Sequence, residues 1–183
     1  MVGGPDPLAA RLSKGDPGAP REMVERHHAE LYRYSRVLLG DASAAEDAVQ
    51  DTFSRAFAAL GKYPPERIEA LYLRPWLYRI ALNVARNVWR DGGLKLPVSD
   101  VPDVNEERSC ARQDLWMDTL QSLGRLPERQ RVAVTLRYLE DLPYAGISAA
   151  TGWPENTCKT LVRRGVSRLG VLMSEGSGFE GGS

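Results

Sequence analysis

The stretch from residue 126 to residue 173 constrains the fold most, because proline and glycine mark its helix starts and its turn. Leu126-Pro127-Glu128 predicts a helix start, since proline in the first turn gives up no hydrogen bond and glutamate suits the positive helix end. Apolar residues at helical spacing extend this helix to about Leu139. Asp141-Leu142-Pro143 should end it, and a short helix from Tyr144 to Ala150 should follow.

A glycine turn and a second long helix complete this stretch. Thr151-Gly152-Trp153 predicts a sharp corner, because glycine tolerates the positive φ that such a corner requires. Pro154 then opens a helix that runs to about Leu172. A short helix, a glycine turn and a basic helix together predict a helix-turn-helix, whose second helix would enter the major groove of duplex DNA.

The second long helix has one basic side. Its apolar residues can face inward, while its basic residues lie largely on the other side, where a duplex backbone would attract them. The basic residues are Lys159, Arg163, Arg164 and Arg168, against one acidic residue, Glu155. For this helix alone, the solvated face of an ordinary amphipathic helix remains the alternative.

Composition excludes several functional classes. Lys and Arg total 24 and Asp and Glu total 24, so the charge signal is local rather than global. Cys110 and Cys158 are too few and too dispersed for a disulfide framework or a zinc site, and they suit a reducing compartment. His27 and His28 are adjacent and would point about 100° apart on a helix, and side chains placed in this way rarely bind the same metal ion. We expect no metal and no cofactor.

The sequence has neither an N-terminal signal nor an apolar run of membrane-spanning length. We therefore expect a soluble cytoplasmic protein without a membrane partner. The chain also has no glycine-rich phosphate loop and no nucleophile with a base at a sequence spacing typical of a catalytic site, which disfavours an enzyme.

The first half predicts three helices. One runs from Arg21 to about Leu39, and after Gly40 either Asp41 or Ser43 should cap the next helix, which ends near Leu60. One side of that second helix is polar and acidic, which by itself usually means only solubility. Its residues are Glu46, Asp47, Gln50, Asp51 and Ser54.

The third helix begins between Glu66 and Pro75 and is strongest from Pro75 to Arg90. Arginine and asparagine at three- and four-residue spacing, interleaved with aromatic residues, make a usable surface for unpaired bases. For Trp76 and Trp89 the alternative is core packing, which is favoured for Trp76. The polar residues are Arg79, Asn83, Arg86, Asn87 and Arg90, and the aromatic ones are Trp76, Tyr78 and Trp89.

These patterns predict an all-α protein of two small helical domains joined by a flexible linker. The boundaries are a largely mobile arm with at most one short helix around Leu8 to Lys14 (1–20), a first domain (21–92), a linker (93–105), a second domain (106–173) and a flexible tail (174–183). We expect two separate bodies. A single body that locks Asp47, Asp51 and Asn83 inside would contradict this organisation.

Two segments resemble the extracytoplasmic-function (group IV) sigma factors of bacterial RNA polymerase, a group of the sigma-70 family. LYRYSRVLLGDASAAEDAVQDTFSRAFAAL with PWLYRIALNVARN is similar to their second domain, and LPERQRVAVTLRYLEDLPYAGISAATGWPENTCKTLVRRGVSRL is similar to their helix-turn-helix fourth domain. The resemblance covers residues 23–172. A helix-turn-helix alone would be weak evidence for this family, but the two segments together, in this order, are specific for it.

The resemblance implies roles that composition cannot show. It implies a promoter-specificity subunit that binds RNA polymerase core enzyme and promoter DNA, both duplex and melted non-template strand, and is not itself a catalyst. The A-E-D-x-V-Q-[DE]-x-F pattern implies core-enzyme binding by Glu46, Asp47, Gln50 and Asp51. The W-L-Y-R-I-A-x-N pattern implies minus-ten recognition and melting by Tyr72, Arg74, Trp76, Tyr78, Arg79, Asn83, Arg86, Asn87 and Arg90.

In the fourth domain the resemblance implies reading of the minus-thirty-five element. Leu161 stands where the family commonly has an arginine, and Gly165 in mid-helix costs about 1 kcal/mol relative to alanine for no reason visible in the sequence. The implied contact residues are Arg137, Asn156, Thr157, Lys159, Thr160, Arg163, Arg164 and Arg168.

Members of the family are often held inactive by an anti-sigma factor, so such a partner is an expectation that rests on the resemblance. The competing hypothesis is a helix-turn-helix regulator that binds duplex DNA without polymerase, with the first domain as a dimerisation or sensing module.

Overall fold

The computed structural model describes residues 6–92 and 110–176, and all the regular structure in these ranges is helical. The first range holds α1 (Pro7–Ser13), α2 (Ala19–Leu39), α3 (Ala42–Leu60), α4 (Pro65–Glu69) and α5 (Leu73–Gly92). The second holds α6 (Cys110–Gly124), α7 (Glu128–Val134), a π-helical segment η1 (Thr135–Leu139), α8 (Tyr144–Thr151) and α9 (Glu155–Gly176). The all-α prediction is confirmed. The predicted linker 93–105 and residues 177–183 of the predicted tail lie outside the described residues.

The junction of α2 and α3 follows from a glycine and an aspartate. Gly40 adopts φ 77°, and its N–H donates to the Arg36 carbonyl, which closes α2. Asp41 then accepts a hydrogen bond from the Ala44 N–H at 2.7 Å, so the cap of α3 is Asp41 and not Ser43. This tight connection lets the two helices pack on each other.

The N-terminal arm contains a short helix close to the range expected for it, Leu8 to Lys14, but this helix is packed on the first domain and not mobile. Residues 7–13 form α1, which packs on α4 and buries Leu8 and Ala9 in the main core. Asp6 caps α1 by accepting from the Leu8 N–H at 3.0 Å, and it also accepts from Arg26 of α2 at 3.3 Å. Residues 6–20 are therefore part of the first domain. The sequence could not show this, because the apolar surface that Leu8 covers is formed by helices distant in sequence.

The helix-turn-helix is confirmed. Asp141, at φ 50°, separates η1 from α8 in a left-handed conformation that aspartate tolerates better than most residues. Gly152, at φ 76°, ends α8, and its N–H donates to the Ser148 carbonyl. The turn is fixed further by Thr151, whose hydroxyl accepts from the Trp153 N–H at 3.2 Å.

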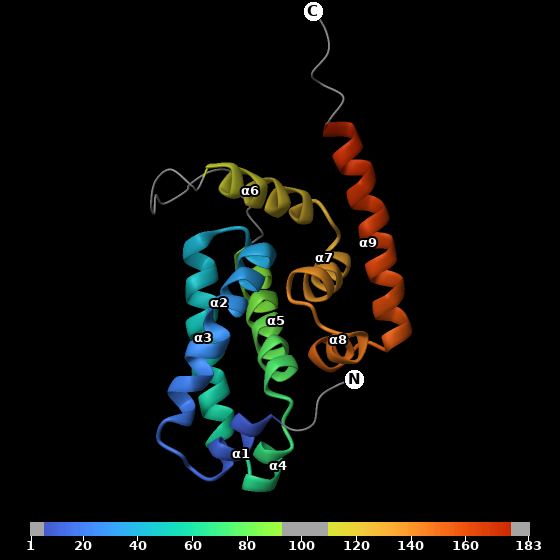
Figure 1. Ribbon diagram of the computed structural model, residues 1–183. Helices are drawn as coiled ribbons and strands as arrows, with labels where there is room; N and C mark the ends of the chain where they lie inside the picture. The colour runs from blue at the N-terminus through green and yellow to red at the C-terminus, as the bar shows by residue number, and fades with distance from the viewer. Residues whose placement is uncertain (1–5, 93–109, 177–183) are drawn as a thin grey trace, which may run out of the picture.

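The two domains are not separate bodies. Figure 1 shows α7, α8 and α9 beside the bundle of α2, α3 and α5, with α8 against α5. One hydrophobic core includes Leu77 and Leu82 of α5 together with Leu142 and Ile147 of the second domain. A smaller core joins Val37 of α2 to Leu120, Leu123, Leu126 and Val134.

The prediction of an all-α fold of two domains is confirmed, although the two domains pack on each other, and this packing does not bury the residues that were named as its test. Asp47 and Asn83 are exposed, and Asp51 is half-buried in an ion pair with Arg55 on the surface of α3. The surfaces that the resemblance assigns to partners therefore keep exposed residues in the packed arrangement.

Candidate nucleic-acid interface

The N-terminal half of α9 alternates between buried and exposed side chains. Cys158 and Val162 are buried against the rest of the domain, whereas Asn156, Lys159 and Arg163 are exposed. Thr157, Thr160 and Leu161 are half-buried, and the Thr160 hydroxyl donates to the Asn156 carbonyl at 2.9 Å. This half of α9 therefore has one polar, basic side, and an α-helix fits into the major groove of duplex DNA.

The remaining basic residues of α9 continue along the same helix. Arg163, Arg164 and Arg168 are exposed. Together with Gln130, Ser167 and Val171 they line a surface hollow of about 420 Å³. Three guanidinium groups around one hollow suit a phosphate backbone, because each can donate several hydrogen bonds to phosphate oxygens.

Gly165 has a structural explanation. A Cβ atom at this position would lie 2.5 Å from Cγ2 of Val134 and 3.4 Å from Cβ of Gln130. Helix α9 thus packs on α7 so closely at this point that a side chain at position 165 would force Val134 to shift. The sequence carried the signal, a glycine inside a helix, but the neighbour that requires it comes from thirty-one positions earlier (165 − 134).

Arg137 is engaged within its own domain. It donates to the Leu142 carbonyl at 3.3 Å and lies 3.8 Å from the Asp141 carboxylate. Its guanidinium also lies over two aromatic rings, 5.9 Å from the ring centre of Tyr138 and 5.4 Å from that of Tyr144. Its side chain is half-buried. If Arg137 contacts a phosphate, its guanidinium must do so while it also donates to the loop before α8.

The acidic side of α3 is open to solvent. Asp47 and Gln50 are exposed, and Glu46 and Asp51 are half-buried. Glu46 lies 3.4 Å from His28 of α2, and Asp51 pairs with Arg55 at 2.9 Å. Val49 and Phe53 of the same helix are buried, so the division of α3 into a core side and an acidic side is confirmed.

The predicted single-strand surface of α5 is only partly exposed. Tyr72 is 43% exposed, and Arg79, Asn83 and Arg90 are exposed, whereas Arg86 and Asn87 are half-buried. Arg90 donates to Asn87 at 3.0 Å, and Arg86 lies 3.4 Å from Glu128 of α7. The polar side of α5 is therefore present as predicted, but the second domain contacts part of it.

Tyr78 is a core residue in the structure and not part of an exposed surface. It is fully buried, its ring meets Tyr34 edge-on at 5.0 Å, and its hydroxyl donates to Glu140 at 2.8 Å. Burial, and then the charge of Glu140, raises the pKa of the Tyr78 hydroxyl far above its ordinary value. The spacing that predicted a stacking platform is also the spacing of a buried stripe, and packing decided between them.

Trp76 and Arg74 are also held by neighbours. Trp76 is half-buried against the main core, and its ring centre lies 6.4 Å from that of Tyr63, which agrees with core packing. Arg74 pairs with Glu30 of α2 at 2.8 Å and donates to the Glu140 carbonyl at 2.5 Å. Trp89 is half-buried too, and its indole N–H donates to the Leu38 carbonyl at 3.3 Å.

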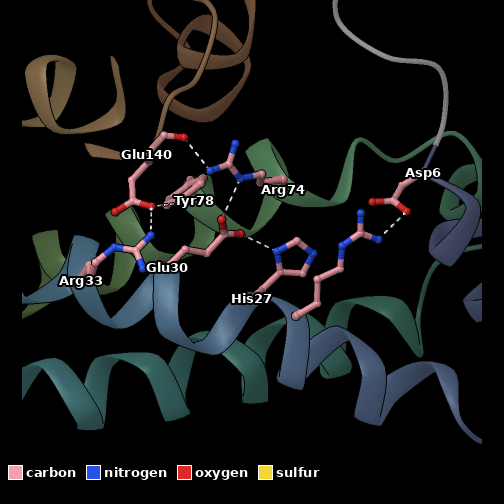
Figure 2. A network of polar contacts seen from close by, with 8 residues as sticks. Asp6, His27, Glu30, Arg33, Arg74, Tyr78 and Glu140 are labelled. Carbon is pink, nitrogen blue, oxygen red and sulfur yellow. Dashed lines mark hydrogen bonds and ion pairs between the residues drawn. The ribbon is translucent and has the colours of Figure 1, made fainter. Parts of the chain in front are cut away.

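Glu140 is the residue that sequence reasoning missed. It is 1% exposed and accepts from Tyr78 and from Arg33 of α2, the latter at 3.0 Å (Figure 2). Burial raises the pKa of Glu140 above its ordinary value, although the hydrogen bond from Tyr78 and the charge of Arg33 act in the opposite direction. An acidic residue at the end of a predicted helix is expected to be exposed to solvent, so no local pattern indicated that Glu140 is buried.

Comparison with known proteins matches both halves of the chain. Residues 23–94 match the family described as Sigma-70 region 2, and residues 117–169 match the one described as Sigma-70, region 4. The RNA polymerase sigma-H factor of Pseudomonas aeruginosa is 30% identical over 172 residues, which cover 86% of this chain and 87% of that protein. The ECF RNA polymerase sigma-E factor of Escherichia coli K12 is 32% identical over 174 residues, with the same coverage.

The chain belongs to the extracytoplasmic-function sigma factors of the sigma-70 family. It is a sigma subunit of RNA polymerase, and the hypothesis of a polymerase-independent regulator is not favoured. The fold agrees: a solved structure of CnrH in complex with the cytosolic domain of CnrY matches this sigma factor with a TM-score of 0.72 at 24% identity, covering 92% of this chain and 96% of that one.

Within residues 6–92 and 110–176, no helix is long and apolar enough to cross a membrane. In the same ranges no group of three or more His, Cys, Asp or Glu side chains could hold a metal ion.

Proposed function

We propose that this sigma factor binds core polymerase through the acidic side of α3, reads the minus-thirty-five element with α9, and reads and melts the minus-ten element with α5. It acts as a non-catalytic promoter-specificity subunit. The single observation that carries the proposal is the N-terminal half of α9, which keeps Asn156, Lys159 and Arg163 exposed beside the buried Cys158 and Val162.

For the minus-thirty-five element, the proposal divides α9 into two parts. The exposed and half-buried polar residues of the first turns would meet base edges, and the arginine-lined hollow would hold the phosphate backbone. Leu161, where the family commonly has an arginine, is half-buried and uncharged, so the proposal gives this position no contact with DNA. The base-edge residues are Asn156, Thr157, Lys159, Thr160 and Arg163, and the phosphate residues are Arg137, Arg164 and Arg168.

For the minus-ten element, exposure favours Tyr72, Arg79, Asn83 and Arg90 as first contacts. Tyr72, in the loop before α5, would form part of a pocket wall for an extruded base, since stacking on an aromatic ring restores energy lost on leaving the duplex. Arg74, Arg86 and Asn87 would join once their present partners release them.

A regulatory protein partner is part of the proposal. The structural match is to CnrH in complex with the cytosolic domain of CnrY, which is a complex of another protein with its own partner. An anti-sigma factor for this chain would act most simply by covering the surfaces proposed above for polymerase and DNA.

Run-off transcription tests the function. Purified core polymerase with this protein should give specific transcripts from a library of genomic fragments, and mapped start sites should share minus-ten and minus-thirty-five sequences. The absence of any specific transcript would overturn the proposal. Co-purification separates the competing hypothesis, because a sigma factor should retain polymerase, whereas a stand-alone regulator should bind its DNA site without it.

A further inference from the structure

The ring of Tyr144 meets two cations of the helix-turn-helix. Tyr144 is the first residue of α8, and its side chain is half-buried. The guanidinium carbon of Arg137 lies 5.4 Å from the centre of this ring, and the ammonium nitrogen of Lys159 lies 5.8 Å from it. Both distances are within the range of about 6 Å in which a cation is attracted to the face of an aromatic ring. One ring of α8 thus joins a residue of η1 to a residue of α9.

The packing of α8 fixes the position of this ring. Pro143 precedes the helix in an extended conformation, at φ −66° and ψ 160°, and its carbonyl accepts from the Ile147 N–H at 3.0 Å. Ile147 is fully buried in the main core. A Cβ atom on Gly146 would lie only 3.0 Å from Cδ2 of Leu142, so α8 packs closely on the loop before it. Tyr144 therefore projects from a tightly packed helix, and Figure 1 shows this helix beside the start of α9.

Lys159 depends on this ring more than Arg137 does. The Lys159 side chain is exposed, and among the described residues its ammonium has neither a hydrogen-bond partner nor an ion-pair partner. A lysine ammonium on its flexible stem occupies many positions unless a neighbour restricts it. Arg137 has such neighbours, because it also donates to the Leu142 carbonyl and lies 3.8 Å from the Asp141 carboxylate. Loss of the ring should therefore release Lys159 and leave Arg137 largely in place.

Arg163 provides the contrast within the same helix. It is exposed and is also a proposed base-edge residue, one turn after Lys159. Within the part of the chain that the structure describes, no aromatic ring lies under the Arg163 guanidinium. The two residues therefore differ in one respect that matters here, because Tyr144 supports Lys159 and no ring supports Arg163.

We propose that Tyr144 is a positioning residue for reading the minus-thirty-five element, whose ring restricts Lys159 to conformations from which its ammonium meets base edges. The inference rests on the proposed function of α9. A side chain that is ordered before binding loses less entropy when it binds, and this favours the promoter sequence that Lys159 recognises. On other sequences Lys159 meets only phosphate, which carries no sequence information and which a mobile ammonium reaches equally well. Tyr144 therefore contributes to sequence discrimination more than to overall attraction.

Binding of the holoenzyme to two duplexes tests this role. Both are fluorescein-labelled; one carries a mapped promoter, and in the other the minus-thirty-five element is scrambled. Anisotropy titrations give the discrimination ratio, which is the Kd for the scrambled duplex divided by the Kd for the promoter. Tyr144→Leu should lower this ratio about two- to fivefold, and it should change the Kd for the scrambled duplex by less than about twofold. Tyr144→Phe keeps the ring and should keep the ratio within about twofold of wild type.

A double-mutant cycle assigns the effect to Lys159. Tyr144→Leu should lower the ratio no further in a Lys159→Ala background, whereas it should keep its full effect in an Arg163→Ala background. An equal loss in both backgrounds would overturn the proposal, because it would indicate a general disturbance of the domain. A loss in Tyr144→Phe as large as that in Tyr144→Leu would also overturn it, since the hydroxyl and not the ring would then be responsible.

The free chain gives a readout that does not depend on DNA. The ring current of Tyr144 should shift the ε-methylene protons of Lys159 upfield in carbon–proton correlation spectra of wild type and of Tyr144→Phe. Tyr144→Leu should move them to the position of an exposed lysine such as Lys62. Spectra in which the Lys159 signals are the same in wild type and Tyr144→Leu would overturn the proposal. Circular dichroism melting checks folding, and Tyr144→Met replaces Tyr144→Leu if that variant is unfolded.

The same measurements separate this proposal from the proposed function of α9. If Lys159→Ala lowers the ratio and Tyr144→Leu does not, the base-edge assignment of Lys159 stands and the role of Tyr144 is overturned. If Lys159→Ala itself leaves the ratio unchanged, the base-edge assignment fails, and the positioning role fails with it.

Discussion

At the scale of single residues, packing decided what spacing left open. Tyr78 and Asn83 lie on one predicted helix and share the family pattern, yet Tyr78 is buried against Tyr34 while Asn83 is exposed. Gly165 looked like a defect in a helix and proved to be the contact point of α9 with Val134. In both cases the deciding neighbour is distant in sequence.

Gly165→Ala should destabilise the protein. Overpacking typically costs about 1–3 kcal/mol, against a gain of about 1 kcal/mol in helix propensity, so we expect a net loss of up to about 2 kcal/mol in the free energy of unfolding. Urea unfolding measures it. Gly170→Ala in the same helix is the control, because nothing lies within 4 Å of its Cβ, and it should stabilise by roughly 0.5–1 kcal/mol. Equal effects of the two substitutions would contradict the close-approach explanation.

Glu30 should give the protein an acid-sensitive contribution to stability. Burial alone would raise the pKa of Glu30, but the hydrogen bond from His27 and the charge of Arg74 outweigh it, so the pKa lies below its ordinary value of 4.5. A carboxyl with a lowered folded-state pKa stabilises the fold above pH 4.5 and loses that contribution as the pH falls through the folded-state value.

The stability advantage of wild type over Glu30→Gln should therefore be full at pH 7 and should shrink below pH 4.5. Urea unfolding across this pH range measures the difference. Glu25→Gln, on the exposed side of the same helix, is the matched control for loss of one carboxylate. A pH-independent difference between wild type and Glu30→Gln would refute the role of this group.

At the scale of the elements, local signals predicted most helices because caps and breakers act over a few residues. Gly40, Asp41, Gly152 and the segment around Pro143 end or begin helices where the sequence indicated. The short helix of the arm was also indicated, around Leu8 to Lys14, but its packing was not. A helix of seven residues is not stable alone, and α1 packs on α4 with Leu8 in the main core.

Asp41→Ala should lower the free energy of unfolding by about 1 kcal/mol, because it removes the acceptor for the Ala44 N–H at the start of α3. Ser43→Ala, the other cap candidate in the sequence, should stay within about 0.5 kcal/mol. Thermal unfolding of both variants provides the comparison, and a larger cost for Ser43→Ala would reverse the cap assignment.

Arg164→Ala tests how α9 meets DNA. Its exposure beside the hollow lined by Arg163 and Arg168 predicts a phosphate contact, so binding of the holoenzyme should weaken by a similar factor on all promoter sequences, and the salt dependence should fall. A loss of about 1–3 kcal/mol confined to one promoter position would instead assign Arg164 to a base edge. Electrophoretic mobility shifts at several salt concentrations distinguish the two.

At the scale of the whole molecule, the three proposed contact surfaces differ in how much the fold leaves open. The acidic side of α3 and the basic side of α9 are accessible, and the strand-facing side of α5 is partly covered by α8 and the loop at Glu140.

Asp47→Lys should weaken binding to core polymerase by roughly three- to tenfold, chiefly through slower association, because it reverses an exposed charge on the proposed docking surface. The thermal unfolding curve should not change. Glu69→Lys, exposed on α4, is the control for net charge. Biolayer interferometry with immobilised core enzyme measures both, and equal affinities would remove α3 from the docking surface.

The sequence by itself determined the helical class, the position of the helix-turn-helix and the two-part family resemblance, because helix periodicity, caps and breakers are local properties of the chain. Only the tertiary structure decided that α1 belongs to the first domain, that Tyr78 and Glu140 meet in a buried contact, and that the two domains share a core. These depend on which surfaces meet across long separations in the chain, and an acidic residue such as Glu140 carries no local mark of the arginine and tyrosine that will surround it.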